Sequence, residues 1–203
     1  MPQYKLTYWP VQALAEPIRF LLSHKGEDFE DFRFERENWP AIKPSMPFGK
    51  VPVLEIDGKM VHQSTAISRY LGKEMGLAGS NNWEDLQIDI AVDTLHDFRQ
   101  AVGGYWYETD EAAKAKKKEV VLNETAPYYL EKFDNLVKEN NGYLANGKLS
   151  WGDMYFVGVS EYISHMLGYS MFDKYENLRK LRDNVITLPK IKAWIEKRPK
   201  TDL

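Results

Sequence analysis

Hydrophobic residues alternate at the start of the chain and then adopt helical spacing. Tyr4, Leu6 and Tyr8 alternate with polar residues, which predicts a β-strand over residues 4–8. Residues 16–22 follow with helical character and carry a proline in the first turn, where proline is tolerated. The chain therefore opens with a strand and a helix.

Three more strands and a helix are predicted in the next part of the chain. Apolar residues mark strands at residues 29–34, 51–56 and 59–62, and an Asp-Gly turn joins the last two as a hairpin. A helix with apolar residues at 3–4 spacing follows, with Gln63 or Ser64 as its expected N-cap. The order strand, helix, strand, loop, strand, strand, helix predicts a small mixed α/β domain.

The composition changes to Gly, Ser and Asn over residues 76–82, which indicates a linker, and only helical patterns follow it. Residues 150–153, Ser-Trp-Gly-Asp, have the form of a capping box that opens a helix. Other helices are predicted at residues 83–102, at residues 124–140 and from residue 188. We therefore expect two domains, an α/β domain at residues 1–76 and an all-helical domain at residues 82–203.

Composition and charge narrow the function further. The 203 residues are 43% hydrophobic and 28% charged, as in globular proteins, and they include no cysteine. A cysteine nucleophile, a disulfide and a zinc–thiolate site are thereby excluded, and a cytoplasmic location is expected. The net charge of −3 argues against a nucleic-acid or anionic-membrane partner, and the lysine-rich residues 114–118 are typical of a solvated helix face. No signal-peptide pattern or membrane-length apolar run is found.

Common catalytic motifs are missing from the sequence. The four histidines lie too far apart for a zinc site, and no phosphate-binding loop, dinucleotide fingerprint or Gly-x-Ser-x-Gly elbow occurs. Asp89, Asp93 and Asp97 do fall on one helical stripe beside His96, although like charges at this spacing repel one another. The stripe is either an exposed polar face or a contact with a subunit or substrate, and no metal is predicted there.

Three segments together carry a resemblance to a known family. Tyr8 ends the first strand, residues 46–52 (Met-Pro-Phe-Gly-Lys-Val-Pro) form a loop, and Gln63-Ser64 opens a helix. In this order the sequence resembles the glutathione transferases over nearly its whole length. It is most similar to the insect-type sigma class, which is related to the glutathione-dependent prostaglandin D synthases. The supporting residues are 4–8, 15–20, 39, 43, 44–54, 62–71, 150–153 and 188–199. The resemblance implies a thioredoxin-like first domain, a helical-bundle second domain and a homodimer.

The resemblance also implies a binding site for glutathione as co-substrate. The implied residues are Tyr8, Trp39, Lys43, Gly49, Lys50, Val51, Pro52, Gln63 and Ser64, with Asp97 from the partner subunit. The helix N-terminus after Gln63 and Ser64 suits the γ-glutamyl carboxylate, and the Val51 backbone can pair with an extended peptide. Taken alone, Gln63-Ser64 is better explained as an ordinary N-cap. The two lysines are equally compatible with solvated side chains, and Trp39 with packing.

The resemblance implies that Tyr8 is the catalytic residue. A thiol with a pKa of about 8.5 is only about 3% thiolate at pH 7, and a lowering by about 2 units is worth about 2.7 kcal/mol. One hydrogen bond to a charged acceptor contributes about 1.5–3 kcal/mol, so a single phenol donor nearly suffices. Without the surrounding motif, a tyrosine packed in the core would be the better explanation of Tyr8, since the chain has 12 tyrosines.

The remaining implied site binds the electrophile. Its expected residues are Trp9, Leu14, Arg99, Tyr105, Tyr155 and Leu203. Leu14 stands where sigma-class relatives can carry an arginine that assists the thiolate, and Arg99 is a candidate to replace it. The leading function is conjugation of glutathione to hydrophobic electrophiles, including lipid-peroxidation aldehydes. The alternatives are a glutathione-dependent prostaglandin D isomerase and a non-catalytic ligand-binding or crystallin-like protein.

Overall fold

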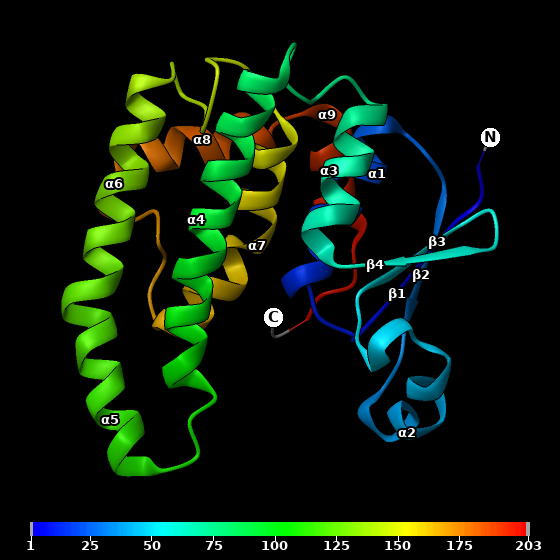
Figure 1. Ribbon diagram of the computed structural model, residues 1–203, viewed down its shortest axis with the longest axis horizontal. Helices are drawn as coiled ribbons and strands as arrows, with labels where there is room; N and C mark the ends of the chain where they lie inside the picture. The colour runs from blue at the N-terminus through cyan, green and yellow to red at the C-terminus, as the bar shows by residue number, and fades with distance from the viewer. Residues whose placement is uncertain (1, 202–203) are drawn as a thin grey trace.

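Figure 1 shows the computed structural model of the chain, which describes residues 2–201. The strands are β1 (Tyr4–Tyr8), β2 (Phe29–Arg33), β3 (Val53–Ile56) and β4 (Lys59–His62). The helices are α1 (Glu16–Lys25), α2 (Trp39–Ile42), α3 (Ser64–Glu74), α4 (Asn82–Trp106), α5 (Glu111–Val120), α6 (Ala126–Glu139), α7 (Trp151–Leu167), α8 (Glu176–Ile186) and α9 (Pro189–Lys197). Short 3₁₀ turns occupy Ala13–Ala15, Arg36–Asn38, Lys43–Ser45 and Pro47–Gly49, and a π-helical turn, Val121–Thr125, joins α5 to α6.

The four strands form one mixed sheet in the order β2-β1-β3-β4. β1 and β2 are parallel and are connected through α1, whereas β1 with β3 and β3 with β4 are antiparallel. The predicted strands are confirmed, except that β2 ends at Arg33 instead of residue 34 and β3 begins at Val53 instead of residue 51. Pro52 has no N–H to donate to the ladder, which explains the later start. The thioredoxin-like α/β fold that the sequence predicts is therefore present.

The rest of the chain is helical, and α7 lies at its centre (Figure 1). The first ten residues of α7 are all buried. The predicted capping box begins this helix: the Ser150 backbone N–H and hydroxyl donate to Asp153 Oδ2 at 2.7 and 2.8 Å, and the Leu144 N–H donates to Oδ1 at 2.8 Å. The hydrophobic pattern missed α8, and the predicted run at residues 124–140 corresponds to α6.

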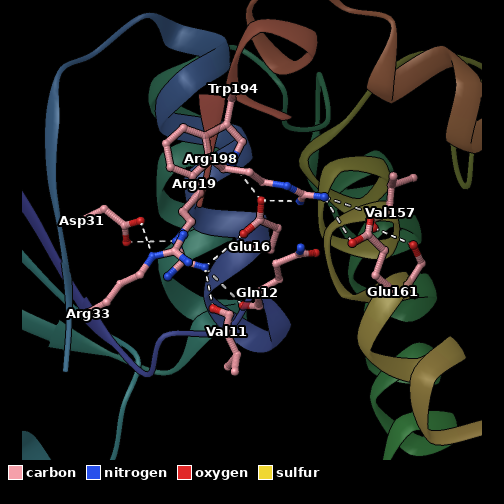
Figure 2. Close-up of polar contacts among 11 residues, drawn as sticks. Val11, Gln12, Glu16, Arg19, Asp31, Arg33, Val157, Glu161, Trp194 and Arg198 are labelled. Carbon is pink, nitrogen blue, oxygen red and sulfur yellow. Dashed lines mark hydrogen bonds and ion pairs between the residues drawn. The ribbon is translucent and has the colours of Figure 1, made fainter. Parts of the chain in front are cut away.

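The α/β part and the helical part share one hydrophobic cluster. At their contact, α1 and α7 approach so closely that a Cβ on Gly158 would lie 2.7 Å from the backbone nitrogen of Pro17. Beside this contact lies a buried polar network, shown in Figure 2, in which Glu16 of α1 accepts hydrogen bonds from Trp194 of α9 and from Arg198. Packing and buried polar contacts thus hold the two parts in one arrangement. Among residues 2–201, no helix is long and apolar enough to cross a membrane.

Candidate active site

A cavity of about 780 Å³ opens beside the end of β1. Its walls come from the α/β part and, in the helical part, from α7 and the residue that follows α4. The lining residues are Tyr8, Trp9, Pro10, Val11, Ala13, Glu35, Arg36, Glu37, Trp39, Tyr107 and Tyr162. Five of these eleven residues are aromatic, and three, Glu35, Arg36 and Glu37, are charged residues of the loop after β2. An apolar molecule of moderate size fits such a cavity.

Tyr8 occupies the last position of β1 and is 5% exposed. Burial raises the pKa of its hydroxyl to about 12, against smaller lowering effects from a backbone hydrogen bond with Leu14 and from the charges of Arg19 and Arg99. The phenol is therefore protonated at neutral pH and can donate a hydrogen bond into the cavity. Leu14 affects the pKa of Tyr8 through a backbone hydrogen bond, and this effect does not depend on the Leu14 side chain.

Two further tyrosines face the same cavity from the helical part. Tyr107, just after α4, and Tyr162, on α7, have hydroxyl oxygens 2.6 Å apart. Burial and this contact raise the pKa of Tyr162, while the positive charge of Arg99 lowers it. Sequence reasoning missed both residues, because Tyr107 lies outside the helical pattern of α4 and Tyr162 shares its buried helix with many other apolar residues. No local signal in the sequence pairs residues 55 positions apart.

Aromatic rings connect Tyr8's neighbour to the loop that follows β2. Trp9 lies 4.6 Å from Phe34 and 5.2 Å from Trp39 between ring centroids, and the rings of Phe34 and Trp39 stack with an interplanar angle of 10°. Trp9 and Trp39, which were predicted in different parts of the site, thus form one wall of the cavity. Both the packing role and the binding role considered for Trp39 are compatible with this position.

The loop before β3 brings several of the predicted residues together. The Val51–Pro52 peptide bond is cis. Gly49 has φ +58°, and a Cβ there would lie 3.2 Å from Cε of Lys43, so the Lys43 side chain passes over this glycine. Lys43 and Lys50 are both exposed. Two cationic side chains therefore stand free at the surface of this loop.

The N-terminus of α3 differs from the expected capped helix. Gln63 has φ +75° and ψ 103°, a region that costs a non-glycine residue of order 1–3 kcal/mol, and no side chain caps the helix. The expectation that Gln63 or Ser64 serves as an ordinary side-chain N-cap is therefore wrong. The first backbone N–H groups of α3 remain available to an anion.

The remaining predicted residues lie outside the cavity. Tyr105 and Tyr155 are each 2% exposed and do not line it, because their helix positions turn them into the core. Leu14 is partly buried against the core, and Arg99 lies on α4 with its Nη2 3.4 Å from Nδ1 of His96. Asp97 is exposed on α4 and does not line the cavity, whereas Leu203 lies outside the described residues. Within residues 2–201, no group of three or more His, Asp or Glu side chains could hold a metal ion.

Comparisons with known proteins give the class to which this fold and site belong. Residues 2–73 match the family model described as "Glutathione S-transferase, N-terminal domain", and residues 96–198 match "Glutathione S-transferase, C-terminal domain". The chain belongs to the glutathione S-transferase family.

Individual relatives agree with this assignment. The chain is 48% identical over 200 residues to glutathione S-transferase S1 of Drosophila melanogaster, covering 98% of this chain and 80% of the relative. It is 42% identical to the hematopoietic prostaglandin D synthase of Gallus gallus, over 99% of both chains. A solved structure of prostaglandin synthase D of Nilaparvata lugens is 56% identical, with a TM-score of 0.94 and coverage of 98% of this chain and 100% of that one.

Proposed function

We propose that this protein is an enzyme that conjugates the glutathione thiolate to hydrophobic electrophiles, with Tyr8 as the catalytic residue. The observation that carries the proposal is the position of the Tyr8 hydroxyl, buried at the wall of a cavity that four other aromatic residues also line, where burial raises its pKa and favours the protonated phenol. Its donation of a hydrogen bond to the sulfur favours the thiolate by about 1.5–3 kcal/mol, which corresponds to a pKa lowered by about 1–2 units.

Glutathione binds, in this proposal, along the α/β part at residues 1–76. The backbone of Val51 pairs with the cysteinyl backbone as a short added strand. The γ-glutamyl carboxylate lies at the uncapped N-terminus of α3, where Gln63 and Ser64 supply further donors. Lys43, Lys50 and Trp39 receive the glycine end, where a lysine ammonium can neutralise the terminal carboxylate.

The electrophile is bound between Trp9 and the residues supplied by the helical part at 82–203. The Tyr107–Tyr162 pair suits a carbonyl-bearing electrophile such as an α,β-unsaturated aldehyde from lipid peroxidation. Two phenols carry two protons, and their mutual hydrogen bond uses one, so one proton remains for a substrate oxygen. When the thiolate attacks the β-carbon, a carbon–sulfur bond forms and the alkene electron pair moves to give an enolate. The phenol stabilises the enolate oxygen, and protonation at the α-carbon completes the conjugate.

A homodimer completes the proposed site. Large apolar side chains are exposed on β4, α3 and α4, namely Met60, Val61, Tyr70, Trp83, Leu86 and Ile90, with exposures of 37–68%. Met60, Val61 and Tyr70 line one hollow between β4 and α3, and the Arg69–Asp89 contact of 2.8 Å joins α3 to α4, which carries the other three. A patch of this extent favours burial against a second copy. Asp97 lies seven residues after Ile90 on the same helical face, from which its carboxylate can reach the γ-glutamyl amine bound by the partner.

The location that we propose is the cytoplasm, because a chain without cysteine needs no oxidising compartment.

Replacement of Tyr8 by phenylalanine tests the proposal. We expect kcat/KM at pH 7 to fall roughly 10- to 100-fold in Tyr8→Phe, with little change in glutathione affinity. The thiolate absorbance of bound glutathione, followed by ultraviolet difference titration, should move from near pH 6.5 to near pH 8.5, because the thiol returns to its ordinary pKa of about 8.5. The raised pKa of Tyr8, about 12, keeps the phenol protonated, so the wild-type rate should not fall between pH 7 and pH 10 for lack of this donor.

Other outcomes of the same titration are equally informative. An unchanged thiolate titration in Tyr8→Phe would show that another group activates the sulfur. Glutathione bound with an ordinary thiol pKa by the wild-type protein would instead indicate a carrier or crystallin-like protein.

A second candidate is a glutathione-dependent prostaglandin D isomerase, favoured by the 56% identical prostaglandin synthase D of Nilaparvata lugens. Leu14, in place of an arginine that can assist the thiolate, argues against full transfer of that activity. Incubation with a prostaglandin endoperoxide distinguishes the two reactions. An isomerase forms the D-type product without consuming glutathione, whereas a conjugating enzyme consumes one glutathione for each electrophile.

A further inference from the structure

A tyrosine of the helical part contacts the first turn of α3. The Tyr155 hydroxyl on α7 lies 3.0 Å from Oγ of Ser64 and 3.2 Å from Oγ1 of Thr65. The Tyr155 side chain is almost fully buried, at 2% exposure, and Ser64 is 9% exposed. The contact therefore joins α7 to the end of α3 that carries Gln63 and Ser64.

The protons of the three hydroxyl groups can be assigned in order. Thr65 donates its proton to the Tyr155 oxygen. Tyr155 has a single proton of its own, and Ser64 Oγ is the other oxygen in contact with its hydroxyl. If Tyr155 donates to Ser64, the three hydroxyl groups form one chain in which Thr65 donates to Tyr155 and Tyr155 donates to Ser64. The Ser64 proton is then available to an acceptor on a bound ligand. Chains of hydrogen bonds ordered in this way strengthen one another.

We propose that Tyr155 is a positioning residue that presents the Ser64 hydroxyl as a donor to the γ-glutamyl carboxylate of glutathione. The inference rests on the proposed function, in which that carboxylate lies at the N-terminus of α3. Tyr155 acts through Ser64 and does not itself contact the peptide. It holds Ser64 in one orientation before the ligand arrives, which reduces the rotamer entropy lost on binding. The helical part thereby contributes to the affinity for glutathione as well as to the electrophile cavity.

A purely structural role for Tyr155 leads to a different result. Loss of a buried hydroxyl that serves only packing lowers thermal stability and weakens all ligands of the site alike. Loss of a group that orients Ser64 weakens only ligands that carry the γ-glutamyl carboxylate. The experiment therefore needs two ligands and two kinds of variant.

Calorimetric titration of glutathione into the wild-type protein, Tyr155→Phe, Ser64→Ala and the double variant tests the coupling. We expect Tyr155→Phe to weaken glutathione binding by roughly 5- to 10-fold, about the value of one hydrogen bond. The double variant should bind no more weakly than Ser64→Ala, because Tyr155 acts only through Ser64. Tyr129→Phe is the matched control: it removes a hydroxyl from α6, where the ring packs on Phe98, and it should leave the affinity unchanged.

The second ligand is 4-aminobutyryl-cysteinyl-glycine, which keeps the amine of glutathione and lacks the γ-glutamyl carboxylate. The wild-type protein and Tyr155→Phe should bind it with affinities within about twofold of each other. The inference is overturned if Tyr155→Phe binds glutathione like the wild type, if both ligands weaken equally, or if the effects of the two substitutions add. A wild-type protein that binds no glutathione, or a Ser64→Ala variant with unchanged affinity, would instead overturn the proposed glutathione site.

Discussion

The charge of Glu16 is expected to contribute strongly to the stability of the contact between the two parts of the chain. Glu16 is 1% exposed, and its Oε1 accepts hydrogen bonds from Trp194 Nε1 and Arg198 Nη1, both at 2.8 Å. Its Oε2 accepts from Nη1 of Arg19 at 3.0 Å, and Arg19 is itself 0% exposed (Figure 2). Replacement of Glu16 by glutamine preserves the shape of the side chain and changes one oxygen into an NH₂ group.

The cost of Glu16→Gln follows from this geometry. The amide oxygen can still accept from Trp194 and Arg198, so the amide nitrogen must face Arg19 Nη1, which is also a donor. Breaking a buried ion pair from one side costs about 3–5 kcal/mol. Arg19 retains Asp31, at 3.0 Å from its Nε, and the carbonyl oxygen of Val11, at 2.9 Å from its Nη1. We therefore expect the low end of that range, about 3 kcal/mol, or a melting temperature lower by about 6–12 °C.

The chain supplies a matched control in the same network. Arg198 also contacts Glu161 at 3.1 Å, but the Glu161 side chain is 58% exposed. Exposed ion pairs contribute about 0–1 kcal/mol, so Glu161→Gln should leave the melting temperature nearly unchanged. Thermal denaturation at pH 7 and one fixed protein concentration compares the variants. A Glu16→Gln protein that melts within about 2 °C of the wild type, or a Glu161→Gln protein destabilised equally, would refute the assignment of stability to the buried charge.

The remaining predictions concern helix packing and the proposed dimer. Gly158→Ala should destabilise the protein by about 2 kcal/mol or more in denaturant unfolding, because its Cβ would lie 2.7–2.8 Å from backbone atoms of Pro17. Gly104→Ala, at an exposed position of α4 where the new Cβ would have no atom within 4 Å, should stabilise it by up to about 1 kcal/mol, and equal effects at the two sites would contradict this account. Ile90→Asp places a charge in the apolar patch on α4 and should shift the protein from dimer to monomer in sedimentation velocity without unfolding it. An unaltered sedimentation coefficient would remove Ile90 from the interface.

Local patterns predicted most of the secondary structure, for reasons that the structure makes clear. The apolar residues Tyr4, Leu6 and Tyr8 that predicted β1 are all buried, and the capping box at residues 150–153 forms because its hydrogen bonds are local. α8 was missed because its apolar positions, Leu178, Leu181 and Val185, are few and are diluted by charged residues, so that helix depends on packing against its neighbours. The positive φ of Gln63 could not be predicted from the sequence either, because no local rule predicts a glutamine with this backbone conformation.

The candidate site was predicted unevenly. Tyr8, Trp9 and Trp39 were identified from ordered motifs in the α/β part, and they line one cavity. In the helical part, Tyr105 and Tyr155 were expected beside the electrophile, whereas Tyr107 and Tyr162 line the cavity instead. All four belong to the same two stretches of chain. Which of them reaches the cavity depends on how α4 and α7 are rotated against the α/β part.

Local patterns along the chain were sufficient to predict the order of the four strands, the family and the tyrosine that ends β1. These depend on neighbouring residues and on motifs that occur close together in the chain. Other contacts are seen only in the folded chain: Glu16 contacts Trp194, 178 residues away, and Tyr155 contacts Ser64, 91 residues away. Such contacts depend on the relative placement of helices that pack through a shared core. The physical reason is that hydrophobic periodicity specifies which face of a helix is buried, and it does not specify which distant side chain that face will meet.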